Sequence, residues 1–245
     1  MNKQPIKRLV KSKTLSMQVY DILCQSIQKM KPSQNKLPSE EDLSKQLGVS
    51  RATIREALKL LSMKRAISSI HGRGTFAHPS VLQLENRIDQ DNDFGRMLKQ
   101  HYGNVQIDVL WNEVTSANAL YDRCFPQMPP IRLCMNYSAL DQKRLFTRYF
   151  FPQEFFIKPL PKQLAITSLP HLSNLYMEEV INHCAMTCCV KMDSEACEQL
   201  GLSPDTPLQC WDEIIYDVGD RPVGIGEVFV HPDNMVLTMV ARLEF

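Results

Sequence analysis

The sequence predicts an α+β protein of two domains, a winged helix-turn-helix at the N-terminus joined to a C-terminal mixed, mostly antiparallel α/β sheet domain. Three observations predict this. Residues 37–76 place two short amphipathic helices and a glycine-rich hairpin in succession. Residues 94–245 alternate helical segments with apolar runs that pair around turn residues. The formal net charge of +1 hides a basic N-terminal third and an acidic remainder.

Apolar residues recur at helical spacing from about residue 14 to residue 30, which predicts the first helix of the N-terminal domain. A second, short helix is expected over 39–47. Ser39 suits its N-cap, Leu43 and Leu47 supply an apolar stripe, and Gly48 ends it.

Ser50 can cap a third helix, which has two distinct faces. Ile54, Ala57, Leu58 and Leu61 recur at i, i+3, i+4 and i+7, the spacing of a buried stripe. The remaining positions suit a recognition helix, whose first turns meet base edges and phosphates in the major groove. We expect DNA contacts from Ser39 on the preceding helix and from Ser50, Arg51, Ala52, Thr53, Arg55 and Lys59.

Short runs of β-forming residues follow at 67–70 and 75–77, joined through His71, Gly72, Arg73 and Gly74. Glycine lets a backbone approach a phosphate without a side chain in the way, so this hairpin is typical of a wing whose tip lies against DNA. We therefore add His71, Gly72, Arg73 and Gly74 to the predicted DNA-binding residues.

These residues resemble the N-terminal domain of GntR-family bacterial transcription regulators. The matching positions are Leu37, Pro38, Ser39, Glu40, Leu43, Gly48, Val49, Ser50, Arg51, Thr53, Arg55, Ala57, Leu58, Leu61, Gly72, Gly74, Thr75 and Phe76. The sequence departs from the family pattern at Glu41, where an arginine that contacts DNA is frequent, and at Arg65, where glycine is common. The resemblance implies a protein that binds double-stranded DNA.

The charge distribution supports this reading. Residues 1–80 contain 15 Lys and Arg against 5 Asp and Glu, whereas the remainder contains 13 against 22. A flexible arm that adds phosphate contacts is expected from the basic residues Lys3, Lys7, Arg8, Lys11 and Lys13. No apolar run approaches the length of a membrane span, so we expect no membrane association and a cytoplasmic location. Domain 1–79 is followed by a polar linker over 80–93 and a C-terminal domain over 94–245.

The C-terminal elements are predicted in order. Helices are expected at 94–101, 116–124, 172–183 and 194–200. Strands are expected at 105–111, 131–139, 144–151, 186–192, 208–217 and 222–231, with a last strand near 236–243. Pairing around Asp141-Gln142 and Gly219-Asp220 indicates hairpins.

This order, together with SNLYMEEV at 173–180, LGLSPDTPL at 200–208 and YDVGDRPVGIGEVFVHPD at 216–233, resembles the UTRA effector-binding domain of the HutC branch of GntR regulators. The resemblance implies a chorismate lyase-like fold with a pocket on its sheet for a small-molecule effector. By position it points to Asn174, Tyr176 and Glu227 as pocket residues.

The first hairpin of this domain departs from relatives that bind sugar phosphates. Met135, Tyr137 and Thr147 stand where those relatives place arginines and a glutamate, so a sugar-phosphate effector is not expected. We predict a more apolar pocket that includes Tyr137, in which Arg132 or Arg148 pairs with a carboxylate of the effector. The alternative, apolar sheet core with surface arginines, stays open.

Three classes of function follow. The first is a transcription regulator, expected to be a repressor, whose homodimer reads a pseudo-palindromic operator. The second is an enzyme of the chorismate lyase-like fold, against which the sequence shows no nucleophile-base set. The third is a metal- or thiol-responsive regulator, suggested by His183, Cys184, Cys188, Cys189 and Cys197. Adjacent Cys188 and Cys189 must face opposite sides of a strand, so we predict buried thiols, no metal and no cofactor.

Overall fold

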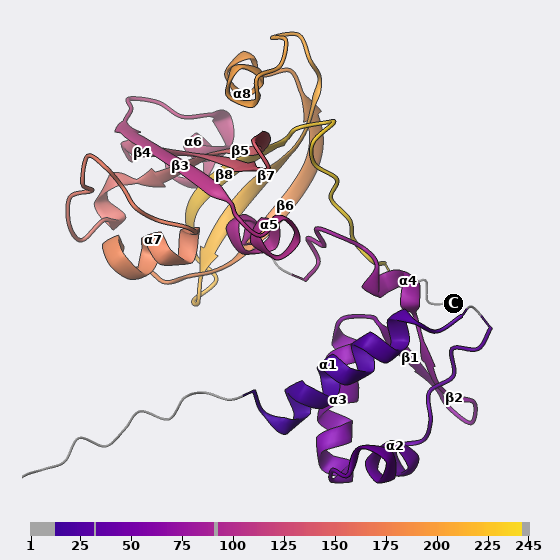
Figure 1. Ribbon diagram of the computed structural model, residues 1–245. Coiled ribbons are helices and arrows are strands. Elements are labelled where there is room, and N and C mark those ends of the chain that lie inside the picture. The colour runs from indigo at the N-terminus through magenta and orange to yellow at the C-terminus, as the bar shows by residue number, and fades with distance from the viewer. Residues whose placement is uncertain (1–12, 32, 91–92, 242–245) are drawn as a thin grey trace, which may run out of the picture. The chain divides into compact units, whose positions relative to one another are not determined.

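The computed structural model describes residues 13–31, 33–90 and 93–241, and the chain divides after Leu84 into an N-terminal unit and a unit spanning Glu85–Thr238. Residues 1–12 of the predicted basic arm lie outside the described residues, whereas Lys13 is described and its Nζ donates to Asp21 Oδ2 at 2.6 Å. Figure 1 shows the elements of the two units, and each unit has its own apolar core. Among the described residues, no helix combines the length and the apolar character needed to cross a lipid bilayer.

The N-terminal unit contains three helices and a two-stranded hairpin, followed by one short helix. Its elements are α1 (Leu15–Gln28), α2 (Glu40–Leu47), α3 (Arg51–Met63), β1 (Ile67–Ile70), β2 (Gly74–Ala77) and α4 (Pro79–Leu82). Side-chain caps set the helix starts: Ser39 Oγ accepts from the Asp42 N–H, and Ser50 Oγ accepts from the Thr53 N–H. Gly48 ends α2 at φ 65°, a left-handed conformation that glycine adopts without strain.

The C-terminal unit is built on a six-stranded sheet in the order β3-β4-β5-β8-β7-β6. Its strands are β3 (Gln106–Glu113), β4 (Pro130–Ala139), β5 (Gln142–Pro152), β6 (Ile181–Lys191), β7 (Leu208–Asp217) and β8 (Pro222–Val230). Every pairing in this sheet is antiparallel, so the sheet is antiparallel throughout rather than mixed. The α+β fold class is confirmed.

Helices cover both faces of this sheet. On one face, α5 (Phe94–Tyr102) and α7 (Leu169–Tyr176) pack on the main core, which takes Met135, Tyr149 and Trp211 from the strands. On the other face lie α6 (Ala119–Cys124) and α8 (Ser194–Leu200), over two smaller apolar clusters. A short 3₁₀ helix, η1 (Gln153–Phe155), follows β5. Figure 1 shows α7 and α8 on well-separated parts of the sheet.

Two element predictions were wrong. The helix expected over 172–183 ends at Tyr176, and residues 181–183 already belong to β6. Extended backbone at Met177 ends the helix, and the β-branched Val180 and Ile181 favour the strand that follows. The last strand, expected near 236–243, is reduced among the described residues to one bridge in which Thr238 lies parallel to Arg87.

That bridge orders part of the segment predicted as a linker. The Thr238 N–H donates to the Asn86 carbonyl oxygen at 3.1 Å, and Asn86 Nδ2 donates to the Val236 carbonyl oxygen at 2.9 Å. The Asn86 N–H donates in turn to Nε2 of His101, on α5, at 3.1 Å. Residues 85–88 are therefore part of the hydrogen-bonded structure of the C-terminal unit.

Candidate DNA interface and effector pocket

Helix α3 separates an apolar face from a polar one, as its spacing predicts. Ile54, Ala57 and Leu61 are fully buried against the core of the N-terminal unit. Arg51, Ala52, Arg55 and Lys59 are exposed, whereas Thr53 is half-buried. Three of these side chains are cationic, so the polar face suits the negative phosphates and base-edge acceptors of a DNA groove.

Arg55 is already engaged by a carboxylate. Its Nε donates to Glu40 Oε2 at 2.7 Å, and the two side chains are 64% and 35% exposed. An ion pair this exposed adds little to stability, but it directs the guanidinium towards the start of α2. Sequence reasoning did not foresee this contact between Glu40 and Arg55.

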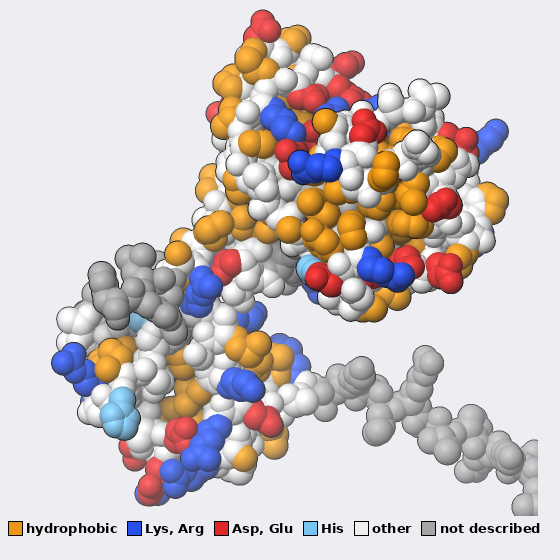
Figure 2. Space-filling model, turned by 180° about the vertical axis from the view of Figure 1, so that it is seen from behind, with side chains coloured by type: hydrophobic (Ala, Val, Ile, Leu, Met, Phe, Trp, Pro, Cys, Tyr) orange, Lys and Arg blue, Asp and Glu red, His pale blue; other side chains and the backbone are white. Residues whose placement is uncertain are grey.

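The hairpin β1–β2 forms the predicted wing. Its strands pair from Ile67 with Ala77 to Ile70 with Gly74, and the four tip residues 71–74 are exposed. Gly72 and Gly74 have φ values of 73° and 103°, which side chains rarely tolerate. Figure 2 shows Lys and Arg side chains gathered on this N-terminal unit.

A groove of about 550 Å³ separates the wing from α3, and three cations line it: Lys36, Lys59 and Arg73. Sequence reasoning missed Lys36. Its backbone bridges Phe76 on β2, and its side chain covers Gly74, where an added Cβ would lie 2.9 Å from Lys36 Cε. A lysine directly before the Leu37-Pro38 motif was the available signal.

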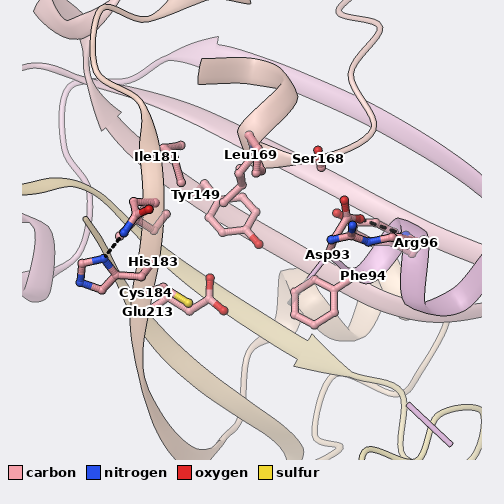
Figure 3. Close-up of a pocket in the computed structure, with 14 residues that line it drawn as sticks. Asp93, Phe94, Arg96, Tyr149, Ser168, Leu169, Ile181, His183, Cys184 and Glu213 are labelled. Carbon is pink, nitrogen blue, oxygen red and sulfur yellow. Dashed lines mark hydrogen bonds between the residues drawn. The ribbon is translucent and has the colours of Figure 1, made fainter. Parts of the chain in front are cut away.

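In the C-terminal unit, a pocket of about 240 Å³ lies between the sheet and the starts of α5 and α7 (Figure 3). Its lining is Asp93, Phe94, Arg96, Tyr137, Tyr149, Ser168, Leu169, Pro170, Ile181, Asn182, His183, Cys184, Glu213 and Ile215. Tyr137 is the one member of the predicted effector set, Arg132, Tyr137, Arg148, Asn174, Tyr176 and Glu227, in this lining. Asn174 is exposed on α7, and Lys158 Nζ lies 4.7 Å from the centre of the Tyr176 ring.

The pocket contains a buried acid that sequence reasoning missed. Glu213 on β7 is 1% exposed, and its Oε1 accepts from Trp211 Nε1 at 2.9 Å. Burial raises the pKa values of Tyr137 and Tyr149 well above the ordinary range, and the Glu213 charge raises both further, so both phenols stay protonated. The signal was a glutamate on the inward-facing side of β7, between Trp211 and Ile215.

Arg132, Arg148 and Glu227 lie together in an ion cluster on the opposite face of the sheet. Arg148 donates to Asp193 at 2.6 Å, to Glu195 at 2.7 Å and to Glu227 at 2.9 Å. Arg132 also donates to Glu195, and Lys191 bridges Asp212 at 2.5 Å and Glu227 at 2.8 Å.

Burial opposes ionisation of Asp193 and Glu195, but their hydrogen bonds to the arginines outweigh it and hold both pKa values below the ordinary range. The cluster therefore ties the start of α8 to the sheet.

Adjacent Cys188 and Cys189 lie on opposite sides of β6, as predicted, but the prediction of buried thiols is wrong for Cys188 and holds fully only for Cys197 in this group. Cys188 is exposed, whereas Cys189 packs on the apolar cluster beneath α8. The structure adds a grouping that spacing did not reveal, with ligand atoms of Cys189, Cys210 and Asp212 within 4.8 Å of one another. The Lys191 Nζ lies 2.5 Å from Asp212 Oδ1, and its positive charge would repel a metal cation at this position.

Comparison with known sequences identifies the N-terminal unit. Residues 15–77 match the family model described as bacterial regulatory proteins, gntR family. The mannosyl-D-glycerate transport/metabolism system repressor MngR of Escherichia coli (strain K12) is 32% identical over 108 residues. That alignment covers 43% of this chain and 44% of MngR.

Two solved structures resemble the fold. The first, described as a possible transcriptional regulator, is YydK of Bacillus subtilis, with TM-score 0.68 and 17% identity over 94% of this chain and 100% of that one. The second is PhnF of Mycobacterium smegmatis, with TM-score 0.52 and 16% identity over 92% of this chain and 100% of that one. At these identities the likeness concerns the fold.

Proposed function

We propose that the whole chain is a sequence-specific, DNA-binding transcription regulator, because residues 15–77 match the family model of bacterial regulatory proteins, gntR family. The observation that carries this proposal is the cationic polar face of α3 beside the glycine-tipped wing. We assign base and phosphate contacts to Ser39, Ser50, Arg51, Ala52, Thr53, Arg55, Lys59, His71, Gly72, Arg73 and Gly74, and we add Lys36.

We propose that the C-terminal unit binds a small-molecule effector that changes operator affinity. The support is the 240 Å³ pocket between the sheet and two helix starts, which combines apolar walls with a few polar groups. The motifs at 173–180 and 216–233 support an assignment to the UTRA type of the HutC branch. The similarity of part of the chain to a repressor favours repression over activation.

We further propose a cytoplasmic homodimer that reads a two-fold symmetric operator. One helix-turn-helix covers too little DNA for tight specific binding, and two-fold symmetry places two recognition helices about one helical turn apart. The edge strand β6 has exposed Met186 and Val190, which a second copy would cover. Sedimentation of the full chain tests this, since it should give twice the 28.2 kDa chain mass.

Selection of genomic DNA fragments by the purified full chain tests the function itself. The proposal predicts enrichment of a short sequence with two-fold symmetry, which competes against random duplex. Uniform recovery of fragments would contradict a sequence-specific regulator. The proposal assigns binding and no catalysis to the C-terminal unit, so turnover of a bound effector would contradict that part.

A further inference from the structure

The interior of the effector pocket combines aromatic rings with one acid. Phe94 on α5, Tyr137 on β4 and Tyr149 on β5 are each at most 3% exposed, and all three line the cavity. The rings of Phe94 and Tyr137 meet edge to face, with centroids 6.1 Å apart and planes at 76°. Figure 3 shows Phe94, Tyr149 and Glu213 converging on the same space from three different elements.

Glu213 sets the sign of charge inside the pocket. Its carboxylate is fixed by Trp211 Nε1 at 2.9 Å and lies close enough to Tyr137 and Tyr149 to affect the pKa values of both. Asp93 and Arg96 carry opposite charges beside the start of α5. Asp93 also serves α5 as its N-cap, because its Oδ1 accepts from the Arg96 N–H at 2.9 Å.

His183 contributes little positive charge to the interior. Its ring stacks on Tyr216 at 5.0 Å, and its Nε2 lies 3.1 Å from Asp220 Oδ1. Figure 3 shows the ring directed away from the space between Tyr149 and Glu213. Glu213 is therefore the acid that a ligand among these rings would meet, and aromatic rings can themselves attract a cation through their negative quadrupole faces.

We propose that the pocket binds a small organic cation whose protonated or quaternary nitrogen lies among Phe94, Tyr137 and Tyr149 and pairs with Glu213. This inference rests on the proposed effector-binding role and names the chemical class of the effector. The cavity of about 240 Å³ limits the ligand to a small metabolite. Aromatic faces and a desolvated carboxylate both favour a cation over a neutral molecule of the same shape.

Calorimetric titration of the full chain tests the proposal with two pairs of probes. Choline is compared with 3,3-dimethylbutan-1-ol, its neutral isostere, and ethanolamine is compared with ethylene glycol. We expect at least one cation to bind about tenfold or more tightly than its neutral partner, a preference that the unmodified protein alone reveals. Two neutral partners that bind as well as their cations would overturn the proposal, as would no binding of either cation at 20 mM.

Three variants locate the site. Glu213→Gln keeps an oxygen for Trp211 but removes the charge, so it should weaken the cation about tenfold while leaving the neutral partner unaffected. Phe94→Leu keeps an apolar side chain but removes a ring, and it should weaken the cation several-fold. Glu198→Gln, the same exchange at an exposed site on α8, is the matched control and should bind as the parent does. Equal affinities in Glu213→Gln and the parent would place the cation elsewhere.

The DNA experiment separates this inference from the function on which it rests. A chain that selects a symmetric DNA site but prefers neutral probes leaves the regulator in place and refutes the cation. A chain that binds the cation in the pocket but selects no DNA site refutes the regulator and leaves the pocket chemistry in place.

Discussion

Arg65 has a backbone conformation that glycine adopts more easily than any other residue. It follows the C-cap of α3 with φ 57°, in the left-handed region, where a side chain costs about 1 kcal/mol. This is the position at which the sequence departs from a glycine common in the family it resembles. Here a substitution seen in the sequence has a definite physical consequence in the structure.

Replacing Arg65 with glycine should therefore stabilise the chain. We expect the free energy of unfolding to rise by roughly 0.5 kcal/mol, because relief of the left-handed strain exceeds the entropy that glycine adds to the unfolded chain. Urea unfolding measures it. Gly48→Ala, at φ 65° after α2, is the opposite control and should lower stability. Loss of stability in Arg65→Gly would contradict the strain.

His231 should make the stability of the folded chain depend on pH. Its Nδ1 accepts from the Asp233 and Asn234 N–H groups, both at 3.2 Å, which requires that nitrogen to be unprotonated. Burial lowers its pKa below the ordinary value, and Arg144 acts in the same direction, while Asp233 opposes them. Because the pKa of His231 is lower in the folded state than in the unfolded chain, the neutral ring stabilises the fold above about pH 6.5. This contribution to the free energy of unfolding is lost as pH falls through the folded-state pKa.

Between pH 7.5 and pH 5, the parent should therefore lose more unfolding free energy than His231→Asn. Urea unfolding across this range gives the comparison, and the titration of the His231 ring by NMR gives its pKa directly. An NMR value at or above 6.5 would show that the folded state does not favour the neutral ring.

At the scale of elements, the ion cluster fixes α8 to the sheet. Arg148 on β5 holds Asp193 and Glu195 at the start of that helix and Glu227 on β8, with 13% of its own side chain exposed. Removing one partner from such a cluster leaves the others charged and poorly solvated, which costs more than the cluster itself contributes. Helix α8 is thus held to the sheet by charged contacts as well as by an apolar cluster.

Arg148→Met should accordingly lower the free energy of unfolding by about 3 kcal/mol. Arg123→Met, at an exposed position on α6, provides the matched control and should change stability by less than about 0.5 kcal/mol. Chemical unfolding of both variants at pH 7 measures the difference. Equal stability of the two variants would mean that water already solvates the Arg148 cluster.

Local patterns predicted the N-terminal unit in detail because its signals are short-range: caps, helical periodicity and a glycine turn between neighbouring segments. The sites of the C-terminal unit depend on which face of a strand a residue occupies and on pairing between distant strands. Arg148 and Glu227 were both predicted for the effector site, and they are indeed direct partners on neighbouring strands. Their side chains, however, lie on the face of the sheet that α8 covers and not on the face with the pocket. Glu213 enters the pocket from β7, whose hairpin with β8 the turn at Gly219-Asp220 predicted, whereas its pairing with β6 and the face that Glu213 occupies had no local signal.

At the scale of the whole molecule, the contrast between a basic and an acidic part of the sequence has a consequence for DNA binding. Affinity for duplex DNA should fall steeply as salt rises, with a log–log slope of about one unit for each phosphate contact. Lys59→Ala should reduce that slope by about one unit per copy bound, or about two for a dimer. Lys162→Ala, exposed in the C-terminal unit, is the control. An unchanged slope in Lys59→Ala would contradict a contact between Lys59 and a DNA phosphate.

The most direct test of α3 as the recognition helix is the affinity of the full chain for its selected DNA site, measured by gel shift for the parent, Arg51→Ala and Arg55→Ala. Each arginine is exposed on α3, so the fold should survive, while the loss of a bidentate contact to guanine should cost about 1–3 kcal/mol on the specific site. Arg123→Ala should bind as the parent does. Parental affinity in both α3 variants would contradict the assignment of α3 as the recognition helix.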